Sequence, residues 1–503
     1  MERTVIGIDI GTSACKVAAF TTSGELIAEE SREYPLLVPG PGRVEQDPEQ
    51  WWDAAAEATG AVVSAIGAHA VAGVGVSGQS WSAVMMDDEG RVLANTPIWM
   101  DTRAQDICDR TVGELGEDVF LKTSGNRFSP SYTTPKIMWF REHRPSVYAR
   151  TTHVLQSNSF IVQRLTGEWT QDSSQSYGIH AFDTLAGAYD PGLADALGLD
   201  LGLLPPVSAC HEVVGVVGAS GARATGLAEG TPVVAGGLDA ACASLGAGVV
   251  DPGQTQEQGG QAGGMSVVTD RPVRDPRLIL SRHVVPGRWL LQGGTIAGGA
   301  SLRWAAETFA AGALTYRQID QEAEAVPSGA EGLWFLPYLS GERGPIWDPK
   351  ARGVLFGLGF STSRGAVWRA VMEGVAYSVL DNIIIAEQAG AKVQTMRSVG
   401  GAASSRLWTQ IKSDVMERPI EVAAPTAAST LGAAVLAAVG TGSVSGFDGA
   451  RQMLAAVERI HEPDPGTSSV YREGFQVFRQ LYHDLAPLMH RTSPIADKEG
   501  TTR

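Results

Sequence analysis

The sequence predicts an α/β protein made of two related domains with a ligand-binding cleft between them. Three observations favour this fold class. Short β-branched strands alternate with amphipathic helices along most of the chain. The opening pattern, a strand followed by a glycine-containing turn and a second strand, returns near residue 255. The length of 503 residues fits two or three domains of ordinary size.

The first domain is expected to open with an antiparallel meander. "TVIGIDI" (4–10) and "CKVAAF" (15–20) are strand-like runs, and "LIAEESREY" (26–34) supplies a third strand. A helix is predicted over 47–67, because Asp47 suits the N-cap position, a proline follows it and a glycine closes the segment.

The next strand contains a glycine pattern that resembles a dinucleotide-binding turn. In "VAGVGVSGQSWS" (71–82), Gly73, Gly75 and Gly78 have the G-x-G-x-x-G spacing. In an NAD-binding unit these glycines follow the strand and open a helix. Here two of them fall within the strand and another strand follows. We therefore interpret them as residues that let a buried strand pack closely, and not as evidence for an oxidoreductase.

A change of composition at 249–254 marks a predicted domain boundary. Before it come a buried strand over 231–235, a Gly-Gly turn and a helix of small residues, and the opening theme returns over 255–269. Further helices are expected over 363–389 and 430–440, and a strand–Gly-Gly–helix unit over 396–416. The expected domains are 1–250 and 251–488, followed by a polar tail over 489–503.

The composition argues against several classes of partner. The formal net charge is −16 and no basic patch with interleaved aromatic residues occurs, so no nucleic-acid partner is expected. No apolar run approaches the roughly 20 residues that span a bilayer, and no secretory signal is evident. We therefore expect no membrane partner and a cytoplasmic location. The cysteines Cys15, Cys108, Cys210 and Cys242 are predicted to be free thiols. Their spacing does not match that of a zinc site.

Two acidic residues lie at turns suited to a phosphorylated ligand. In "GIDIGTSACK" (7–16), Asp9 precedes a Gly-Thr-Ser turn and Lys16 follows it. Backbone N–H groups of such a turn can approach an anion, a carboxylate can hold Mg²⁺ and a lysine offsets phosphate charge. Asp239 follows a Gly-Gly turn at the start of a helix. It is either an N-cap or a base that takes a proton from a substrate hydroxyl.

Two further motifs suit a sugar and a nucleotide base. In "IWMDTRAQD" (98–106), Trp99, Asp101 and Arg103 alternate, so on a strand they would share one face and suit a polyhydroxylated ligand. The alternative for this pattern is a surface salt bridge. In "VGGAASSRLW" (399–408), the Gly-Gly turn before a Ser-capped helix leaves backbone on which a flat ring can lie.

The order and spacing of these motifs resemble those of the FGGY carbohydrate kinases. The resemblance extends from Val5 to about Leu485. This family lies within the actin, Hsp70 and hexokinase-type ATPase superfamily. The resemblance implies two RNase H-like domains and ATP-dependent phosphoryl transfer to a sugar hydroxyl. The segments that look like the xylulokinase branch are "VEQDPEQWW" (44–52), "GVSGQ" (75–79), "EGTPVVAGGLDAACASLGAGVVDPG" (229–253), "PYLSGERGPIWDPKARGVLFGL" (337–358), "RAVMEGVAYSVLDN" (369–382) and "SRLWTQIKSDVMERPIEV" (405–422).

The resemblance also implies site residues and makes a homodimer an option. Asp239 matches the general base, and Asp9 and Asp239 match the carboxylates on the Mg²⁺ side. The positions that match contacts to ATP are Gly11, Thr12, Ser13 and Lys16 in the first domain and Gly260, Gln261, Gly299, Arg303, Gly401 and Ser405 in the second. The implied sugar-facing residues are Gln79, Ser80, Trp81, Trp99, Asp101 and Arg103.

The chain departs from the family pattern at three places. Gly260-Gln261-Ala262 stands where the family usually has Gly-Thr-Ser, and Ala402 stands where a third glycine is common. Ser80-Trp81 replaces the Met-His pair of xylulokinases, and loss of a polar sugar contact can change specificity strongly.

More than one substrate class therefore remains open, as does a non-catalytic role. The expected substrate is xylulose or a related small ketose. The alternative is an aldonate or a polyol, because W-x-D-T-R over 99–103 resembles gluconate kinases. A degenerate, non-catalytic relative is a further alternative. A repressor would need a DNA-binding segment before the first hairpin, and only four residues precede Val5.

Overall fold

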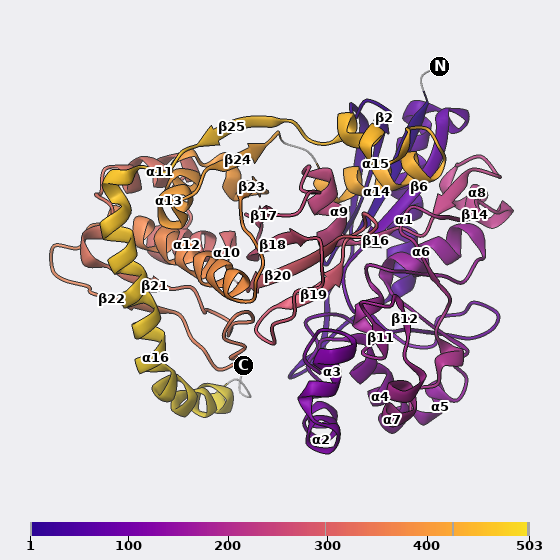
Figure 1. The fold of residues 1–503 in the computed structure, drawn as a ribbon, viewed down its shortest axis with the longest axis horizontal. Helices are drawn as coiled ribbons and strands as arrows, with labels where there is room; N and C mark the ends of the chain where they lie inside the picture. Colours follow the sequence, from indigo (N-terminus) through magenta and orange to yellow (C-terminus); the bar gives the residue numbers. More distant parts are fainter. Residues whose placement is uncertain (1–2, 297, 425–426, 500–503) are drawn as a thin grey trace.

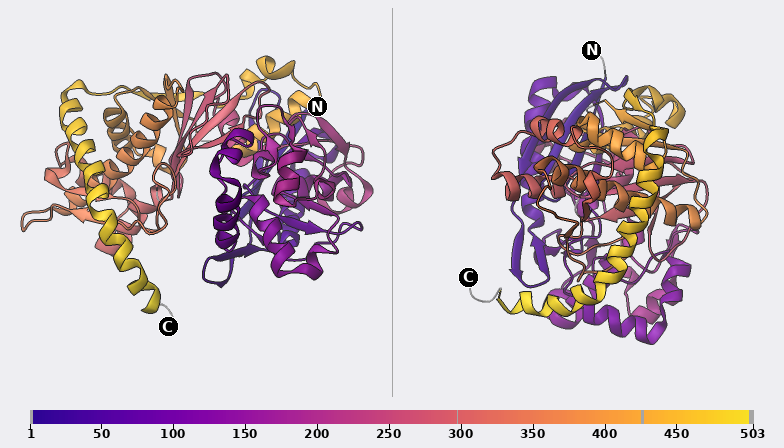
Figure 2. Two further views of the ribbon diagram at one scale, coloured as in Figure 1. Left: turned by 60° about the horizontal axis from the view of Figure 1, so that its bottom comes forward. Right: turned by 90° about the vertical axis from the view of Figure 1, so that its left-hand side faces the viewer.

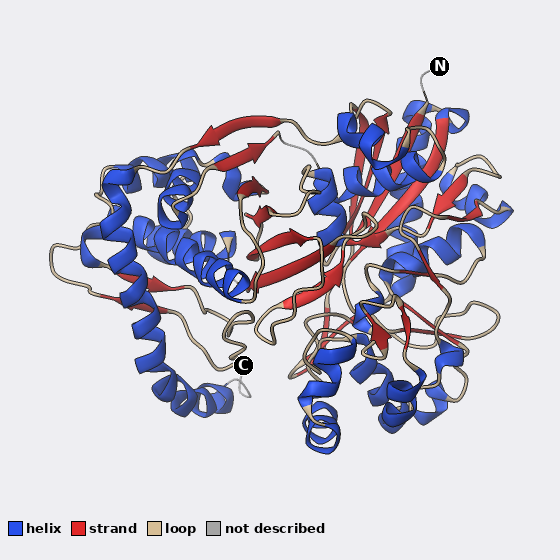
Figure 3. Ribbon diagram, in the orientation of Figure 1, coloured by secondary structure: helices blue, strands red, loops and turns tan. Residues whose placement is uncertain are grey.

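The structure, a computed structural model, describes residues 3–296, 298–424 and 427–499. Its elements form two lobes, each built around a seven-stranded sheet (Figure 1, Figure 2). Helices pack around both sheets, as the colouring by secondary structure shows (Figure 3). The predicted α/β class is confirmed.

The first sheet has the order β14-β15-β6-β1-β2-β3, with β16 also paired to β6. The first three strands form the predicted antiparallel meander, whereas β6 is parallel to β1 and β15 is parallel to β6. Its strands are β1 (Thr4–Ile10), β2 (Ala14–Thr21), β3 (Leu26–Glu33), β6 (Val71–Gly78), β14 (Val213–Val216), β15 (Pro232–Val234) and β16 (Gly237–Leu238).

The second sheet repeats this topology, as the returning sequence theme predicted. A meander of β17, β18 and β20 continues through two parallel pairings to β23 and β24, and β25 closes the edge in antiparallel fashion. Its strands are β17 (Gln254–Gln258), β18 (Gly263–Thr269), β19 (Ile279–Arg282), β20 (Trp289–Thr295), β23 (Thr395–Val399), β24 (Ile420–Ala423) and β25 (Val457–His461).

Helix α1 (Pro48–Ile66) begins and ends as predicted. The Asp47 side chain accepts a hydrogen bond from the N–H of Glu49, and Gly67 is the C-cap residue. The other helices before residue 250 are α2 (Gln105–Leu115), α3 (Glu117–Thr123), α4 (Thr133–His143), α5 (Pro145–Tyr148), α6 (Ser157–Thr166), α7 (Pro191–Leu197), α8 (Ala219–Thr225) and α9 (Asp239–Gly246).

The long helix expected over 363–389 is α12 (Arg364–Gln388), and Ser363 caps it by accepting from the N–H of Ala366. The segment 489–499, expected as a polar tail, instead continues α16 (Ser468–Glu499), because its residues keep helical hydrogen bonding. The remaining helices are α10 (Gly299–Ala310), α11 (Tyr316–Glu324), α13 (Arg406–Met416), α14 (Ala428–Gly440) and α15 (Gly446–Gly449).

Helix α14 does not follow the expected division of the chain at residue 250. It packs on β1, β6 and α9, and Figure 1 shows it beside the N-terminal strands. The contact is close because its surface and that of β6 are made of small residues. A Cβ atom added to Gly75 would lie 2.0 Å from the backbone oxygen of Ala433. The glycines of β6 therefore serve close packing, as predicted.

Short strand pairs complete the fold around the two sheets. In the described part of the chain, no helix is both long enough and apolar enough to cross a membrane. The short strands are β4 (Leu37–Gly40), β5 (Arg43–Gln46), β7 (Val84–Met86), β8 (Thr96–Pro97), β9 (His153–Leu155), β10 (Gln171–Asp172), β11 (Phe182–Asp183), β12 (Ala188–Tyr189), β13 (Val207–Ser208), β21 (Trp334–Leu336) and β22 (Val354–Phe356).

Candidate active site

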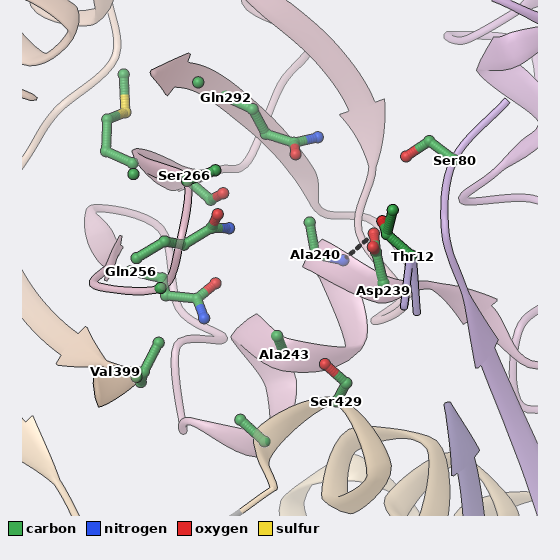
Figure 4. A pocket seen from close by; sticks show the side chains of 18 of the residues that line it. Thr12, Ser80, Asp239, Ala240, Ala243, Gln256, Ser266, Gln292, Val399 and Ser429 are labelled. Atoms are coloured by element: carbon green, nitrogen blue, oxygen red, sulfur yellow. Dashed lines mark hydrogen bonds between the residues drawn. The ribbon is translucent and has the colours of Figure 1, made fainter. Parts of the chain in front are cut away.

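A cavity of about 440 Å³ lies between the lobes, where the carboxyl ends of β1, β6 and β16 face the turn between β17 and β18. This is the edge at which open α/β sheets bind ligands. Figure 4 shows Thr12, Ser80 and Asp239 on one side and Gln256, Ser266 and Gln292 on the other. Both lobes therefore contribute polar side chains to one cavity.

The hairpin between β1 and β2 forms one wall of this cavity. Asp9 and Lys16 face each other across the ladder, and the Lys16 side chain is exposed. Of the residues predicted to face the phosphates, Thr12 and Lys16 line the cavity, and Gly11 and Ser13 shape the turn beside them. The hairpin thus presents a hydroxyl and an ammonium group to a ligand.

Asp239 is the first residue of α9 and faces the cavity. Its Oδ1 accepts a 2.6 Å hydrogen bond from the N–H of Ala240, and Leu238 is the N-cap residue, so the carboxylate is not a helix cap. The start of α9 is held by a buried network. The N–H of Leu238 donates to Ser174 Oγ (2.8 Å), whose hydroxyl donates to the buried Asp172 (2.5 Å).

The electrostatics of the cavity suit proton transfer. Burial and the nearby charge of Asp9 raise the pKa of Asp239 from 3.8 to about 7, the range in which a general base works best. Burial also raises the pKa of Asp9, although the 2.5 Å hydrogen bond that it accepts from Ser77 Oγ acts in the opposite direction. Asp9 and Asp239 line one cavity, and neither forms an ion pair among the described residues. Such a pair suits Mg²⁺, which binds through one or two carboxylates plus phosphate oxygens.

A second cavity, of about 460 Å³, adjoins the first at Gly259 and Gly260. It lies among the first turns of α10 and α13 and the side of α11. Ser405 Oγ accepts from the N–H of Trp408 (3.0 Å), so this hydroxyl caps α13 at the cavity wall. The lining includes every residue predicted for the nucleotide from the second domain: Gly260, Gln261, Gly299, Arg303, Gly401 and Ser405.

Ser80 and Trp81 line the first cavity beside Asp239. The Trp81 ring stacks on Tyr132 with a centroid distance of 4.3 Å, and its backbone has a φ of 65°. Lys136 Nζ donates to the Trp81 carbonyl oxygen at 2.7 Å. Because bulky residues seldom adopt a positive φ, the surrounding contacts must hold this conformation. Trp99 also lines the cavity, and its Nε1 donates to Thr12 Oγ1 at 3.0 Å.

The prediction that residues 98–103 form a strand with one ligand-facing side is wrong. Only Thr96–Pro97 is strand, and the chain then turns. Arg103 forms ion pairs with Asp101 and Glu45, both at 2.7 Å, so these charges neutralise one another outside the cavity lining. Gln79 is buried as well and donates to Gln46 Oε1 at 2.7 Å.

Sequence reasoning assigned no role to several residues that line the same cavity. Tyr177 and Arg343 lie close to Asp239, and amide side chains of Gln256, Gln258 and Gln292 project from the second sheet. The alternation of glutamines along "TQEQ" (255–258) was a detectable signal. Arg343 sits in "SGERGP" (340–345), and only its position in the fold indicates a role.

Comparison with known proteins identifies the family. The model of the FGGY family of carbohydrate kinases, N-terminal domain, matches residues 4–246, and the C-terminal domain model matches residues 262–441. The chain belongs to this family. Among curated proteins, the xylulose kinase of Bacillus subtilis (strain 168) is 32% identical over 482 residues, covering 95% of this chain and 96% of that protein. The gluconokinase of the same organism is 26% identical and covers 96% of each.

Solved structures agree with this membership. The crystal structure of xylulose kinase from Rhodospirillum rubrum has a TM-score of 0.90 and 33% identity, and covers 97% of this chain and 100% of that one. As an FGGY member, the protein is a carbohydrate kinase that uses ATP as phosphate donor and a sugar as acceptor. The two cavities of the site adjoin each other at Gly259 and Gly260.

Proposed function

We propose that this kinase transfers the γ-phosphoryl group of ATP to a hydroxyl of a small ketose, xylulose or a related pentulose, with Asp239 as general base. The observation that carries the proposal is the Asp239 carboxylate, with a pKa near 7, in a cavity that adjoins the predicted nucleotide cavity. The xylulose kinases among its relatives support the substrate class.

Each wall of the cavity has a part in this reaction. Asp239 takes the proton of the acceptor hydroxyl as its oxygen attacks phosphorus. Thr12 and Lys16 bind phosphate oxygens from one side, and the Gly260 turn binds them from the other. Asp9 and Asp239 are the residues that would hold Mg²⁺, which offsets phosphate charge when bound.

The base assignment is tested by Asp239→Asn. Asparagine keeps the size of the side chain but cannot accept the proton, so we expect phosphorylation to fall at least about 1000-fold. Nucleotide affinity, measured by calorimetry with a non-hydrolysable ATP analogue, should change less than about threefold. Asp53→Asn, an exposed change in α1, is the matched control. A mutant that keeps a tenth of the wild-type rate would show that Asp239 is not the base.

The substrate question centres on Ser80 and Trp81. The indole stacks on Tyr132 and meets the Tyr177 ring edge-on, with centroid distances of 4.3 Å and 5.9 Å. A gluconokinase relative and a gluconate kinase structure favour an aldonate as the second candidate substrate. The structure is the crystal structure of gluconate kinase from Lactobacillus acidophilus, with 25% identity and a TM-score of 0.91 over 98% of this chain and 100% of that chain.

The double variant Ser80→Met, Trp81→His tests whether this pair reads the sugar. An imidazole can donate and accept, so we expect kcat/KM for D-xylulose to rise at least about tenfold relative to other sugars. ADP release with a panel of ketoses, polyols and aldonates measures the profile. Trp81→Phe, which keeps the stacking and removes the N–H, serves as control. An unchanged profile in the double variant would rule out this role.

Magnesium dependence, a homodimer, a cytoplasmic location and the absence of nucleic-acid and membrane partners stay predictions. Because Gln261 departs from the family pattern, the ADP-release assay also tests whether the protein is a non-catalytic relative. A panel in which wild-type protein releases no ADP with any sugar would favour that alternative.

A further inference from the structure

Among the described residues, the guanidinium group of Arg343 forms no ion pair, although the charges of Glu342 and Asp239 act on it from a distance. It follows β21 in the loop "SGERGP" and lines the same cavity as Asp239. Among the described residues, its guanidinium makes no hydrogen bond or ion pair, and its Nε is enclosed from solvent. The guanidinium carbon lies over the Trp99 ring, 4.9 Å from its centroid.

Three other enclosed arginines among the described residues are neutralised by carboxylates. Arg103 pairs with Asp101 at 2.7 Å, Arg369 pairs with a glutamate at 2.8 Å, and Arg397 pairs with a glutamate at 2.6 Å. Removing a cation from water is unfavourable unless an anion compensates it. Burial accordingly lowers the pKa of Arg343. An enclosed cation that opens into a cavity is therefore suited to an anionic ligand.

The adjacent glutamate, Glu342, does not form an ion pair with Arg343. Glu342 turns its Oε1 to the backbone N–H groups of Ile296 and Arg343, each at 2.8 Å, and burial raises its pKa to about 7. Among the described residues no ion pair joins Glu342 to the guanidinium. The carboxyl group instead accepts from the backbone of the arginine, so its charge acts on the guanidinium from a distance and leaves the N–H groups of Arg343 without an acceptor among the described residues.

The guanidinium lies between the two phosphate turns. On one side, a Cβ atom placed on Gly294 would be 3.1 Å from Nη2 of Arg343, and Gly294 pairs with Gly264 in the strand that leaves the Gly260 turn. On the other side, Trp99 holds Thr12 of the first hairpin through its Nε1. This position favours an anion at the junction of the turns over one at the far end of a sugar.

We propose that Arg343 is a catalytic residue of the second lobe that binds the non-bridging oxygens of the phosphoryl group during its transfer. The proposal rests on the proposed function and adds a named ligand of the transferred group. The acceptor oxygen forms a bond to the γ-phosphorus and gives its proton to Asp239. The bond from that phosphorus to the β,γ-bridging oxygen breaks, and its electron pair leaves with ADP. Arg343 donates hydrogen bonds to the oxygens that carry the charge.

The first test is the kinetics of Arg343→Met and Arg343→Lys. Methionine keeps the apolar contact with Trp99 but removes the charge, so we expect kcat to fall at least about 100-fold. The KM for a neutral ketose should change less than about threefold. Lysine restores a point charge without the planar fork and should recover part of kcat.

The second test measures anion binding without turnover. Inorganic phosphate is titrated calorimetrically into wild-type and Arg343→Met protein, and the variant should bind it at least about tenfold more weakly. The matched control is Arg418→Met, which removes a guanidinium paired with Glu387 at 2.7 Å on the outside of the second lobe. Thermal melting of each variant confirms that it is folded.

Three results would overturn the proposal. One is a kcat within threefold of wild type in Arg343→Met. Another is equal phosphate affinity in the two proteins, which is decisive even if no sugar is phosphorylated and the proposed function fails. The third is an effect confined to the KM of aldonates such as gluconate, since Arg343 would then bind a substrate carboxylate.

Discussion

At the scale of single residues, Asp239 combines a functional position with an unfavourable environment. It is enclosed at the start of α9 and shares a cavity with Asp9, so its ionised form is disfavoured in the folded state. In the unfolded chain its pKa returns to the ordinary value near 3.8. Catalysis therefore requires a charge state that weakens the fold.

This linkage predicts a pH-dependent effect of Asp239→Asn on stability. Because the folded pKa is raised, the stability that the protonated carboxyl provides at low pH is lost as the pH rises through about 7. Asparagine does not ionise, so the melting temperature of the variant should exceed that of wild type by about 2 °C or more at pH 8 and by less at pH 5. Thermal melts without magnesium or nucleotide measure both.

The control for this prediction is Asp53→Asn on the exposed face of α1. It should show no comparable dependence on pH. If Asp239→Asn changed the melting temperature equally at pH 5 and pH 8, the carboxyl group would not titrate differently in the folded protein.

At the scale of elements, the packing of β6 against α14 depends on backbone contact. The strand presents glycines to a helix composed mostly of Ala, Gly, Leu and Val, and at Gly75 the backbones of strand and helix are in direct contact. A Cβ on Gly432 would lie 1.9 Å from the backbone oxygen of Cys242 in α9, so the same helix also approaches α9 closely. This layer carries both Asp9 and Asp239 at its edge.

Gly75→Ala tests this close approach. The added methyl group would lie 2.0 Å from the Ala433 backbone oxygen, so strand and helix must separate. We expect a loss of at least about 2 kcal/mol in the free energy of unfolding, measured by urea titration.

The matched control is Gly113→Ala in α2. No atom lies within 4 Å of the added Cβ there, and alanine favours a helix over glycine by up to about 1 kcal/mol, so this variant should be slightly more stable. Equal stability of Gly75→Ala and wild type would contradict the packing interpretation.

At the scale of the whole molecule, two sheets of the same topology face one cavity, and α14 packs on the first of them. Helix α14 covers the first sheet, although in the chain it follows the strands of the second sheet from β17 to β24. Leu431 and Val435 of this helix share a buried cluster with Val5 and Phe20. The first lobe therefore completes its core with a segment from the C-terminal part of the chain.

A fragment of residues 1–250 should accordingly fail to fold cooperatively. Without α14, apolar surface on β1 and β6 loses its cover. Circular dichroism during heating should show a broad, shallow change for the fragment and a sharp transition for the full chain under the same conditions. A sharp transition in the fragment would show that its core is complete without α14.

The sequence by itself determined the features that depend on local spacing. The caps of α1 and α12, the β1–β2 hairpin and the position of Asp239 after a Gly-Gly turn follow from residues close together in the chain. The repeated strand pattern also predicted the repeated sheet. The motif order was sufficient to indicate the kinase family, and the matches to family models confirm it.

The tertiary structure decided what depends on residues far apart. The salt-bridge alternative for 99–103 anticipated the local pair of Arg103 with Asp101 but not the second partner, Glu45, because β5 packs beside β8 only in the fold. Helical periodicity gave the length of α14 but not the sheet that it covers. The unpaired charge of Arg343 also emerged only in the fold. Burial and neutralisation are set by neighbours that packing brings together, and local sequence patterns do not encode them.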